Sequence, residues 1–296
     1  MTGLMTKRKA LLSGVDPVCA PGGDLNRRVV VWGLAGATAT VAGSAHPQAG
    51  PRSQGPERGA LLIIGGGDRG REIQHAAWSL AGGREAQWVY IPTAFHDDDL
   101  GSALPPTFAR HARRRVQVLH TRDRSEADTA AFAAPLQNAT AVFIDGGRQW
   151  RLTDAYLDTR THAALRGVLD RGGVVVGTSA GAAVLASYLM RGSPEGSDTV
   201  MSPGHEVGFG FLTHAAIDPH VVKWRRERDM AQVVVAHPDV LGIGLDEGAA
   251  VVVRNGDMLR VNGRAVLITD GVDHDGEPFL CLAKNRSFDL TNWRPR

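Results

Sequence analysis

The stretch VVVGTSAGAAVLA, residues 174–186, decides the fold that we predict for this chain. Its three valines form a short apolar run typical of a buried strand, and its alanine-rich end favours a helix. Between them, GTSAG (177–181) matches G-x-S-x-G, a sharp strand-to-helix turn that presents a serine hydroxyl at the end of a strand. We therefore expect Ser179 to be a nucleophile, with a tight turn capped by a serine as the alternative.

The start of the helix after Ser179 adds an electrostatic reason for this interpretation. A helix N-terminus carries partial positive charge and free N–H groups, so the N–H of Ala180 is a natural oxyanion donor. A second glycine-rich turn, GGRQ (146–149), follows another apolar run. Its glycines allow the backbone to approach a ligand closely, so Gly147 could complete the oxyanion hole and Gln149 could bind substrate.

Apolar runs alternate with amphipathic segments on both sides of the Ser179 turn. This order predicts an α/β fold of three layers, with a mostly parallel sheet covered by helices on both faces. The chain then ends in short strands with turns at Asn255-Gly256 and Asn262-Gly263, which read as hairpins at one sheet edge. The strands are expected at 60–64, 88–91, 116–119, 141–144, 174–176, 214–217, 241–245, 249–254, 258–261 and 266–268, and the helices at 70–80, 150–156, 161–169 and 218–236.

A serine nucleophile needs a base, and the histidines differ in their positions. His220 follows the strand expected at 214–217, and a histidine at a strand end can reach a nucleophile on a neighbouring strand. His96 and His205 are the rival bases. For the acid that orients the histidine, the polar loop after the Ser179 helix offers Glu195 and Asp198.

Two further acids, Asp218 and Glu206, are also open as partners of the histidine. The spacing along the chain does not choose among the four carboxylates.

The composition excludes several classes of protein. The chain has 296 residues with 33 basic and 31 acidic side chains, for a net charge of +2. This balance gives no global basic footprint for nucleic acid or an anionic membrane. We expect no nucleic-acid partner.

The N-terminal segment, residues 1–49, reads as an export signal. A twin arginine at 27–28 precedes a weakly apolar run shorter than the ~20 residues that span a bilayer. We expect export to the periplasm or the outside if this signal operates, a cytoplasmic protein otherwise, and no membrane span in the mature chain. Residues 50–59 read as a linker, and residues 60–296 as the hydrolase domain.

Five segments together resemble the family of cyanophycinase and α-aspartyl dipeptidase. The segments are IIGGGD (63–68), VYIPTA (89–94), FIDGGRQ (143–149), GTSAGAAVLA (177–186) and IDPH…LGIGLDEGAAVVV (217–253). The resemblance implies a flavodoxin-like, class I glutamine-amidotransferase-like fold and a serine exopeptidase without metal or organic cofactor. Cyanophycinases cleave β-linked aspartyl-arginine units from cyanophycin, so the expected partner is an aspartate- and arginine-containing peptide or polymer. Relatives often form dimers, which makes a homodimer an expectation from resemblance alone.

Carried over by position, Ser179 resembles the family's nucleophile and His220 its histidine. Gln149 resembles the substrate-contacting glutamine, Asp218 the aspartate before the histidine, and Arg226 the second arginine of the segment that follows. The family's acid falls in the loop that holds Glu195 and Asp198.

Two departures from the family pattern bear on specificity. Pro219 stands where relatives usually have glutamine. The arginines of the R-x-R-x-x-R segment fall on Trp224, Arg226 and Asp229, and an aspartate reverses the charge preferred for a ligand group. A non-catalytic binding protein and an aspartyl dipeptidase of different specificity therefore stay as alternatives.

Two other rivals are weaker. A glutamine amidotransferase would need a cysteine at position 179, and neither Cys19 nor Cys281 is placed there. A nucleotide-binding module is disfavoured because GGG (65–67) lacks the spacing of G-x-G-x-x-G.

Overall fold

The computed structural model describes residues 17–19, 53–95, 116–261 and 264–296. The chain divides into two units, Met1–Pro51 and Arg52–Arg296. Of the first unit only a short 3-10 turn, η1 (Pro17–Cys19), is described. The twin arginine and the apolar run of the expected export signal lie outside the described residues.

A nine-stranded sheet, in the order β14-β13-β10-β9-β1-β5-β4-β2-β3, forms the larger part of the second unit. The strands β1, β5, β4, β2 and β3 are parallel to one another. The strands β9, β10, β13 and β14 pair antiparallel with their neighbours. The fold is therefore α/β with a mostly parallel core and antiparallel strands from the C-terminal part, as predicted. The strands are β1 (Ala60–Ile64), β2 (Trp88–Ile91), β3 (Val116–Val118), β4 (Ala141–Ile144), β5 (Val174–Thr178), β9 (Ala250–Arg254), β10 (Asp257–Arg260), β13 (Ser287–Asp289) and β14 (Arg294–Pro295).

A second sheet of five strands, in the order β12-β11-β8-β7-β6, was not predicted. The pairs β6–β7 and β7–β8 are parallel, and β11 pairs antiparallel with β8 and β12. The apolar runs were recognised as strands, but periodicity does not say which strands pair. These strands are β6 (Ala186–Tyr188), β7 (Leu212–Pro219), β8 (Leu241–Leu245), β11 (Val266–Thr269) and β12 (Leu280–Cys281).

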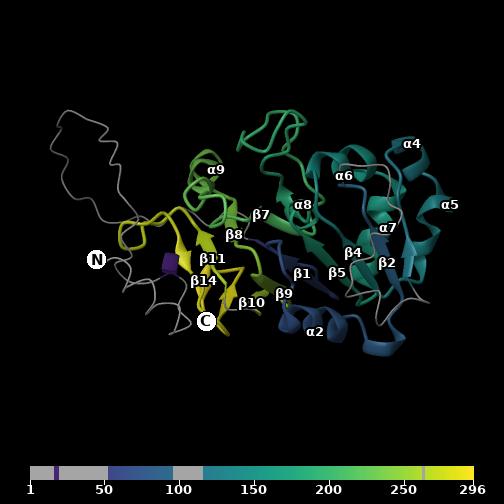
Figure 1. The fold of residues 1–296 in the computed structure, drawn as a ribbon, viewed down its shortest axis with the longest axis horizontal. Helices are drawn as coiled ribbons and strands as arrows, with labels where there is room; N and C mark the ends of the chain where they lie inside the picture. Colours follow the sequence, from purple (N-terminus) through teal and green to yellow (C-terminus); the bar gives the residue numbers. More distant parts are fainter. Residues whose placement is uncertain (1–16, 20–52, 96–115, 262–263) are drawn as a thin grey trace. The chain divides into compact units, whose positions relative to one another are not determined.

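Helices cover both faces of the parallel strands, because alternate residues of each strand point to opposite sides. Leu62 of β1 packs in one apolar cluster with Ile73 of α2. Leu61 packs in another cluster that contains residues of α6, α7 and α8. Figure 1 shows α2 on the opposite side of the central strands from α6 and α8. The helices are α2 (Arg71–Leu80), α4 (Arg124–Ala127), α5 (Ala130–Ala133), α6 (Gln149–Tyr156), α7 (Arg160–Asp170), α8 (Ala180–Ala183) and α9 (Met230–Ala236), with 3-10 turns η2 (Gly83–Glu85) and η3 (Ala134–Gln137).

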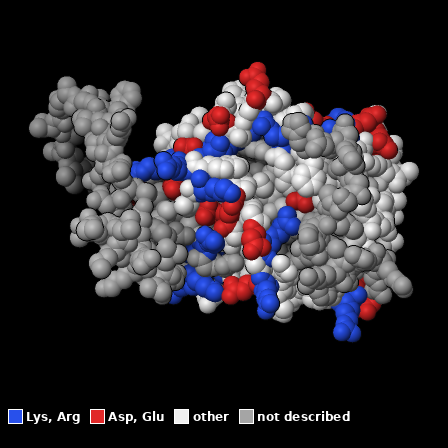
Figure 2. All heavy atoms as spheres, in the orientation of Figure 1, with Lys and Arg blue, Asp and Glu red and all other residues white. Residues whose placement is uncertain are grey.

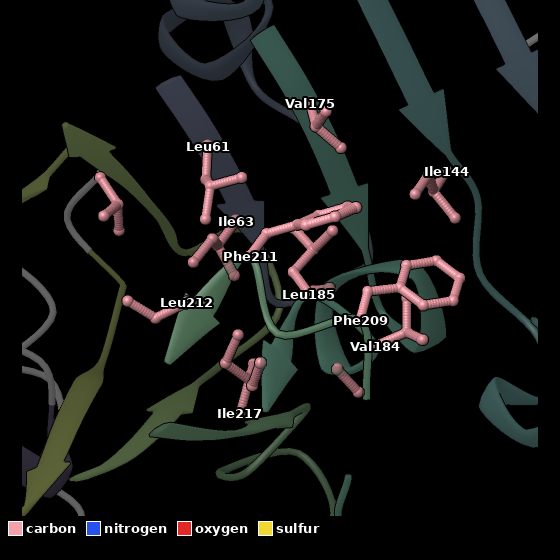
Figure 3. Packing of buried hydrophobic residues seen from close by; sticks show 14 of the residues in the cluster. Leu61, Ile63, Ile144, Val175, Val184, Leu185, Phe209, Phe211, Leu212 and Ile217 are labelled. Atoms are coloured by element: carbon pink, nitrogen blue, oxygen red, sulfur yellow. The ribbon is translucent and has the colours of Figure 1, made fainter. Parts of the chain in front are cut away.

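One hydrophobic core joins the two sheets. Its fully buried side chains include Ile63 of β1 and Val175 of β5 from the first sheet, and Ile217 of β7 from the second. Phe209 and Phe211, in the segment before β7, fill the space among these strands and α8 (Figure 3). Burial of each side chain of this size contributes roughly 1.5–3 kcal/mol to the stability of the fold. Because the core is shared, it fixes the distance between the two sheets.

Two stretches differ from their predicted structure. The helix expected over 218–236 is confined to α9, because β7 continues to Pro219 and turns fill the chain from there to Asp229. The described part of the linker, from Ser53 onward, belongs to the domain. Ser53 is fully buried and donates to the carbonyl of His214 at 2.8 Å, and Gln54 bridges Thr213.

The predicted hairpin at Asn255-Gly256 is confirmed. Both residues have positive φ, 54° and 76°, as a two-residue turn of the type common in hairpins requires. They join β9 to β10. The second expected turn, at 262–263, lies outside the described residues.

The described surface carries charges of both signs. Figure 2 shows Lys and Arg interspersed with Asp and Glu across the central part of the drawn face. No helix among the described residues has the length and apolar character needed to cross a membrane.

Candidate active site

Ser179 sits on a strained turn between β5 and α8. Its φ of 52° and ψ of −119° are unusual for a residue with a side chain. Glycines on both sides allow the turn to be tight. A Cβ on Gly177 would lie 2.2 Å from the carbonyl oxygen of Gly181, and one on Gly181 would lie 2.1 Å from that of Ile144. The sequence therefore forms the predicted elbow because only glycine fits these two positions.

His220 lies directly against Ser179. The Oγ of Ser179 is 2.8 Å from Nε2 of His220, and Nδ1 of the same ring is 2.9 Å from Oε1 of Glu247. His220 follows β7 and Glu247 follows β8, two neighbouring strands of the second sheet. The nucleophile comes from the first sheet, so the hydrogen-bonded row Ser179–His220–Glu247 spans the junction of the two sheets.

The carboxylate of Glu247 has a second partner. Nζ of Lys223 lies 2.9 Å from Oε1 and 3.0 Å from Oε2. Burial works to raise the pKa of Glu247, but the hydrogen bonds from Lys223 and His220 outweigh it, so the pKa lies below its ordinary value. Glu247 is therefore ionised at neutral pH and can stabilise a positively charged imidazole.

The imidazole ring of His220 is held from both faces. Gly66 lies against one face, where a Cβ would stand 2.3 Å from Cε1 of the ring. The indole of Trp224 stacks on the ring with centroids 4.1 Å apart. His220 is only 8% exposed, so the orientation of its ring is fixed by packing as well as by hydrogen bonds.

Two backbone N–H groups next to Ser179 have no hydrogen-bond acceptor among the described residues. They belong to Ala180, the first residue of α8, and to Gly147. The turn at Gly146 lies close to the nucleophile, since a Cβ there would be 3.1 Å from Cβ of Ser179. A carbonyl oxygen beside Ser179 could accept from these N–H groups as negative charge develops on it.

The carboxylate of Asp145 supports this turn. Its Oδ1 accepts the N–H of Gly146 at 2.7 Å and a bond from Arg69 at 3.2 Å, and its Oδ2 accepts the hydroxyl of Tyr90 at 2.8 Å. Burial and the neighbouring Asp145 raise the pKa of Tyr90, which keeps the phenol a donor. The hydrogen bonds of Asp145 thereby hold the turn that carries Gly147 in place.

A sequence model of peptidase family S51 matches residues 61–261. The chain belongs to this family. Cyanophycinases of Trichormus variabilis and Synechococcus elongatus are 32% and 31% identical to it, over 75% and 80% of this chain and 77% and 76% of theirs. The crystal structure of a peptidase from an acI-B1 Actinobacterium has a TM-score of 0.62, with 22% identity, and covers 80% of this chain and 98% of that one. At that identity, the structural likeness shows the fold.

Membership of family S51 makes the chain a serine-type peptidase. Within this S51 site, two sequence expectations for the acid are replaced. Glu195 and Asp198 are exposed on the loop after β6, and Asp198 pairs with Arg226 at 3.1 Å. Among the described residues the acid that reaches the histidine is Glu247, because the end of β8 lies beside the end of β7.

The two other acids that the sequence left open are engaged elsewhere. Glu206 accepts the hydroxyl of Tyr188 at 2.7 Å, and Asp218 pairs with Arg191 at 3.0 Å. The rival base His205 lies in the segment between β6 and β7, where its N–H donates to Ser202. The other rival, His96, lies outside the described residues.

Two residues expected to contact substrate have hydrogen-bond partners within the protein. The amide nitrogen of Gln149 donates to the carbonyls of Met190 and Arg191 at 2.9 and 2.8 Å, so it holds the loop after β6. Asp218 is 1% exposed and faces the guanidinium of Arg191, which also binds Asp229 at 2.6 Å. Both side chains are thus engaged by other parts of the protein.

Arg226 lies near the histidine through one intermediate ring. Its guanidinium is 4.7 Å from the ring centroid of Trp224, which stacks on His220. One of its nitrogens, Nη1, is buried without a hydrogen-bond partner among the described atoms. This placement agrees with a substrate-contacting position more closely than those of Gln149 and Asp218.

Glu247 was missed although the signal that found His220 also applies to it. His220 comes directly after β7 and Glu247 two residues after the end of β8, and the working groups of such sheets gather at these strand ends. The sequence pattern did not show that β7 and β8 are neighbouring strands. Among the described residues no three His, Cys, Asp or Glu side chains cluster as metal ligands do.

Proposed function

We propose that this S51 peptidase is a serine exopeptidase of the cyanophycinase kind, which hydrolyses cyanophycin to β-aspartyl-arginine dipeptides. The proposal of a catalytic triad is supported by the continuous hydrogen-bonded row from Ser179 through His220 to Glu247, with distances of 2.8 and 2.9 Å. The proposal of the substrate is supported by the cyanophycinases of about 30% identity.

In the proposed reaction, Nε2 of His220 accepts the proton of Ser179 as Oγ attacks the scissile carbonyl carbon. The N–H groups of Ala180 and Gly147 bind the oxyanion. The imidazolium donates its proton to the leaving amine, and the C–N bond breaks to leave an ester on Ser179. Water, deprotonated by His220, hydrolyses this ester. Glu247 stabilises the imidazolium throughout and keeps its tautomer.

The test is hydrolysis of cyanophycin and a panel of α- and β-aspartyl dipeptides by the wild type and by Ser179→Ala. Release of β-aspartyl-arginine by the wild type alone is expected, since losing the nucleophile costs several orders of magnitude, roughly 10⁶-fold in a comparable triad. A serine-directed phosphonate should label the wild type and not the variant.

A related aspartyl dipeptidase of different specificity is the second candidate, and one contact favours it. Asp229 stands where relatives have an arginine, and its carboxylate binds Arg191 rather than opening toward a ligand. Cleavage of another dipeptide, and not of cyanophycin, would assign this activity. Absence of turnover together with absence of phosphonate labelling would favour the non-catalytic binding protein.

A further inference from the structure

A polar cleft of about 510 Å³ opens beside the carboxylate of Glu247. Pockets that hold ligands of drug size have roughly 300–1,000 Å³, so a dipeptide unit fits in this volume. Its walls are formed by residues that follow β1, β7 and β8 and by one that precedes β11, so both sheets contribute. The lining residues are Asp68, Gly70, Val222, Lys223, Asp246, Glu247, Gly248 and Arg264.

Two opposite charges in this cleft are unused. Lys223 is engaged by Glu247, and Asp246 accepts the backbone N–H of Lys223 at 3.0 Å. By contrast, neither Asp68 nor Arg264 has a side-chain hydrogen bond or ion pair to any of the residues that the structure describes. Opposite charges that share a cleft without pairing leave room for a ligand between them.

Gly248 shows that these two residues flank one point of the cleft. A Cβ on Gly248 would lie 3.4 Å from Cγ of Arg264 and 3.5 Å from the carbonyl oxygen of Asp68. Gly248 itself follows Glu247, so the two charges are placed next to the acid of the triad. The chain thus presents one carboxylate and one guanidinium, both exposed, beside the site.

We infer that this cleft is a subsite for a zwitterionic peptide unit, with its guanidinium or ammonium group on Asp68 and its carboxylate on Arg264. Such charge-assisted bonds are among the strong polar contacts in proteins, and an arginine can hold a carboxylate through two of them. An aspartyl-arginine unit carries both groups. This inference rests on the proposed function and adds to it a second place at which a long substrate is held.

The position of the cleft says which unit it holds. Glu247 lines the cleft, whereas Ser179 and His220 do not, and His220 lies between Glu247 and Ser179 in the hydrogen-bonded row. A residue of extended chain spans only about 3.5 Å. A group bound in the cleft is therefore distant from the scissile bond. The subsite acts on binding of longer substrates and not on the chemical step.

The experiment compares peptides of two and of four aspartyl-arginine units as substrates for Asp68→Asn and Arg264→Gln. Each variant should raise KM for the four-unit peptide about tenfold, leave kcat unchanged, and leave both constants for the two-unit peptide unchanged. Matched controls are Asp170→Asn, at the end of α7, and Arg254→Gln, at the end of β9, which are exposed at the opposite ends of their strands or helices from the site.

Unchanged KM for the four-unit peptide, or an equal rise for both lengths, would overturn the inference. Should the wild type cleave neither peptide, the proposed function has failed, and the cleft is tested separately. Calorimetry then measures binding of the four-unit peptide to the Ser179→Ala protein with and without Asp68→Asn and Arg264→Gln. Weaker binding in the charge variants supports the subsite, and equal binding overturns it.

Discussion

At the scale of single residues, the site depends on short polar contacts made by groups that the backbone holds in unusual conformations. Both Ser179 and His220 have positive φ, 52° and 60°. Such a conformation costs of order 1–3 kcal/mol for a residue with a side chain. It persists because Gly177 and Gly181 allow close packing below the serine.

Replacing Glu247 by glutamine should lower kcat about 10³- to 10⁴-fold, with folding preserved. The amide cannot stabilise the imidazolium and favours the wrong tautomer of His220. Steady-state kinetics on the best substrate of the wild type measure the effect. Glu195→Gln is the matched control and should match the wild type; a comparable loss in that variant would return the acid's role to the loop after β6.

Lys223→Met should reduce kcat/KM a few-fold at pH 7, and the deficit should widen as the pH falls toward 4. Lys223 and His220 hold the pKa of Glu247 below its ordinary value, so without the lysine this carboxylate takes up a proton at a higher pH. Among the described residues, Asp68 and Arg264 share the cleft beside Glu247. The substitution changes neither of these side chains.

A pH–rate profile of the wild type, Lys223→Met and Lys223→Arg checks this prediction. The arginine variant keeps the positive charge and should follow the wild type. A parallel profile for the methionine variant would mean that Lys223 does not act through Glu247.

At the scale of elements, the loop after β6 is tied to the end of β7 by one buried cation. Arg191 binds Asp218 and Asp229 and donates to the carbonyl of Ser197 at 3.0 Å. Burial alone would lower the pKa of Arg191, but the two carboxylates outweigh it and raise the pKa. This contact also explains the aspartate at position 229.

Arg191→Met should destabilise the protein by about 3–5 kcal/mol, because it removes the guanidinium that is hydrogen-bonded to the buried carboxylate of Asp218. Urea or thermal denaturation at pH 7 measures the loss. Asp198→Asn is the control, since that side chain is 99% exposed and its ion pair contributes little. Equal stability of Arg191→Met and wild type would contradict the role of this cation.

How far the sequence predicts the molecule differs between elements. The runs that became β1, β2 and β4 were placed to the residue, because each is apolar, short and bounded by turn residues. The helix expected over 218–236 was too long, because β7 continues to Pro219 and turns precede α9. The second sheet was missed, and Glu247 with it, because pairing between strands is set by tertiary packing that periodicity does not carry.

The same reason explains why the contacts of Gln149 and Asp218 within the protein were not predicted. Their residue types suit substrate contacts, and only the position of the loop after β6 shows that backbone carbonyls and Arg191 use them. Ser179 and His220 were found because the strand-end rule needs no knowledge of the partner.

At the scale of the whole molecule, the described domain begins within the residues expected as a linker, and the export signal stays a prediction. We expect protein purified from its native host to begin after residue 45, because the twin arginine and apolar run are followed by small residues, Gly43 and Ala45, that offer a processing site. N-terminal sequencing measures the start. A mature chain that begins upstream of Arg27 would contradict export by this signal. The matched reference for the sequencing is full-length protein from the cytoplasm.

The division of the triad between two sheets also determines when activity can arise during synthesis. Ser179 leaves the ribosome early, whereas the strand pair that delivers His220 and Glu247 is complete only after β8 has emerged. Domains fold as units while the chain is made, so nascent or truncated chains that end before residue 220 lack both His220 and Glu247, and those that end before residue 247 still lack Glu247. Under the proposed mechanism, hydrolysis is thus expected only of chains that extend past Glu247.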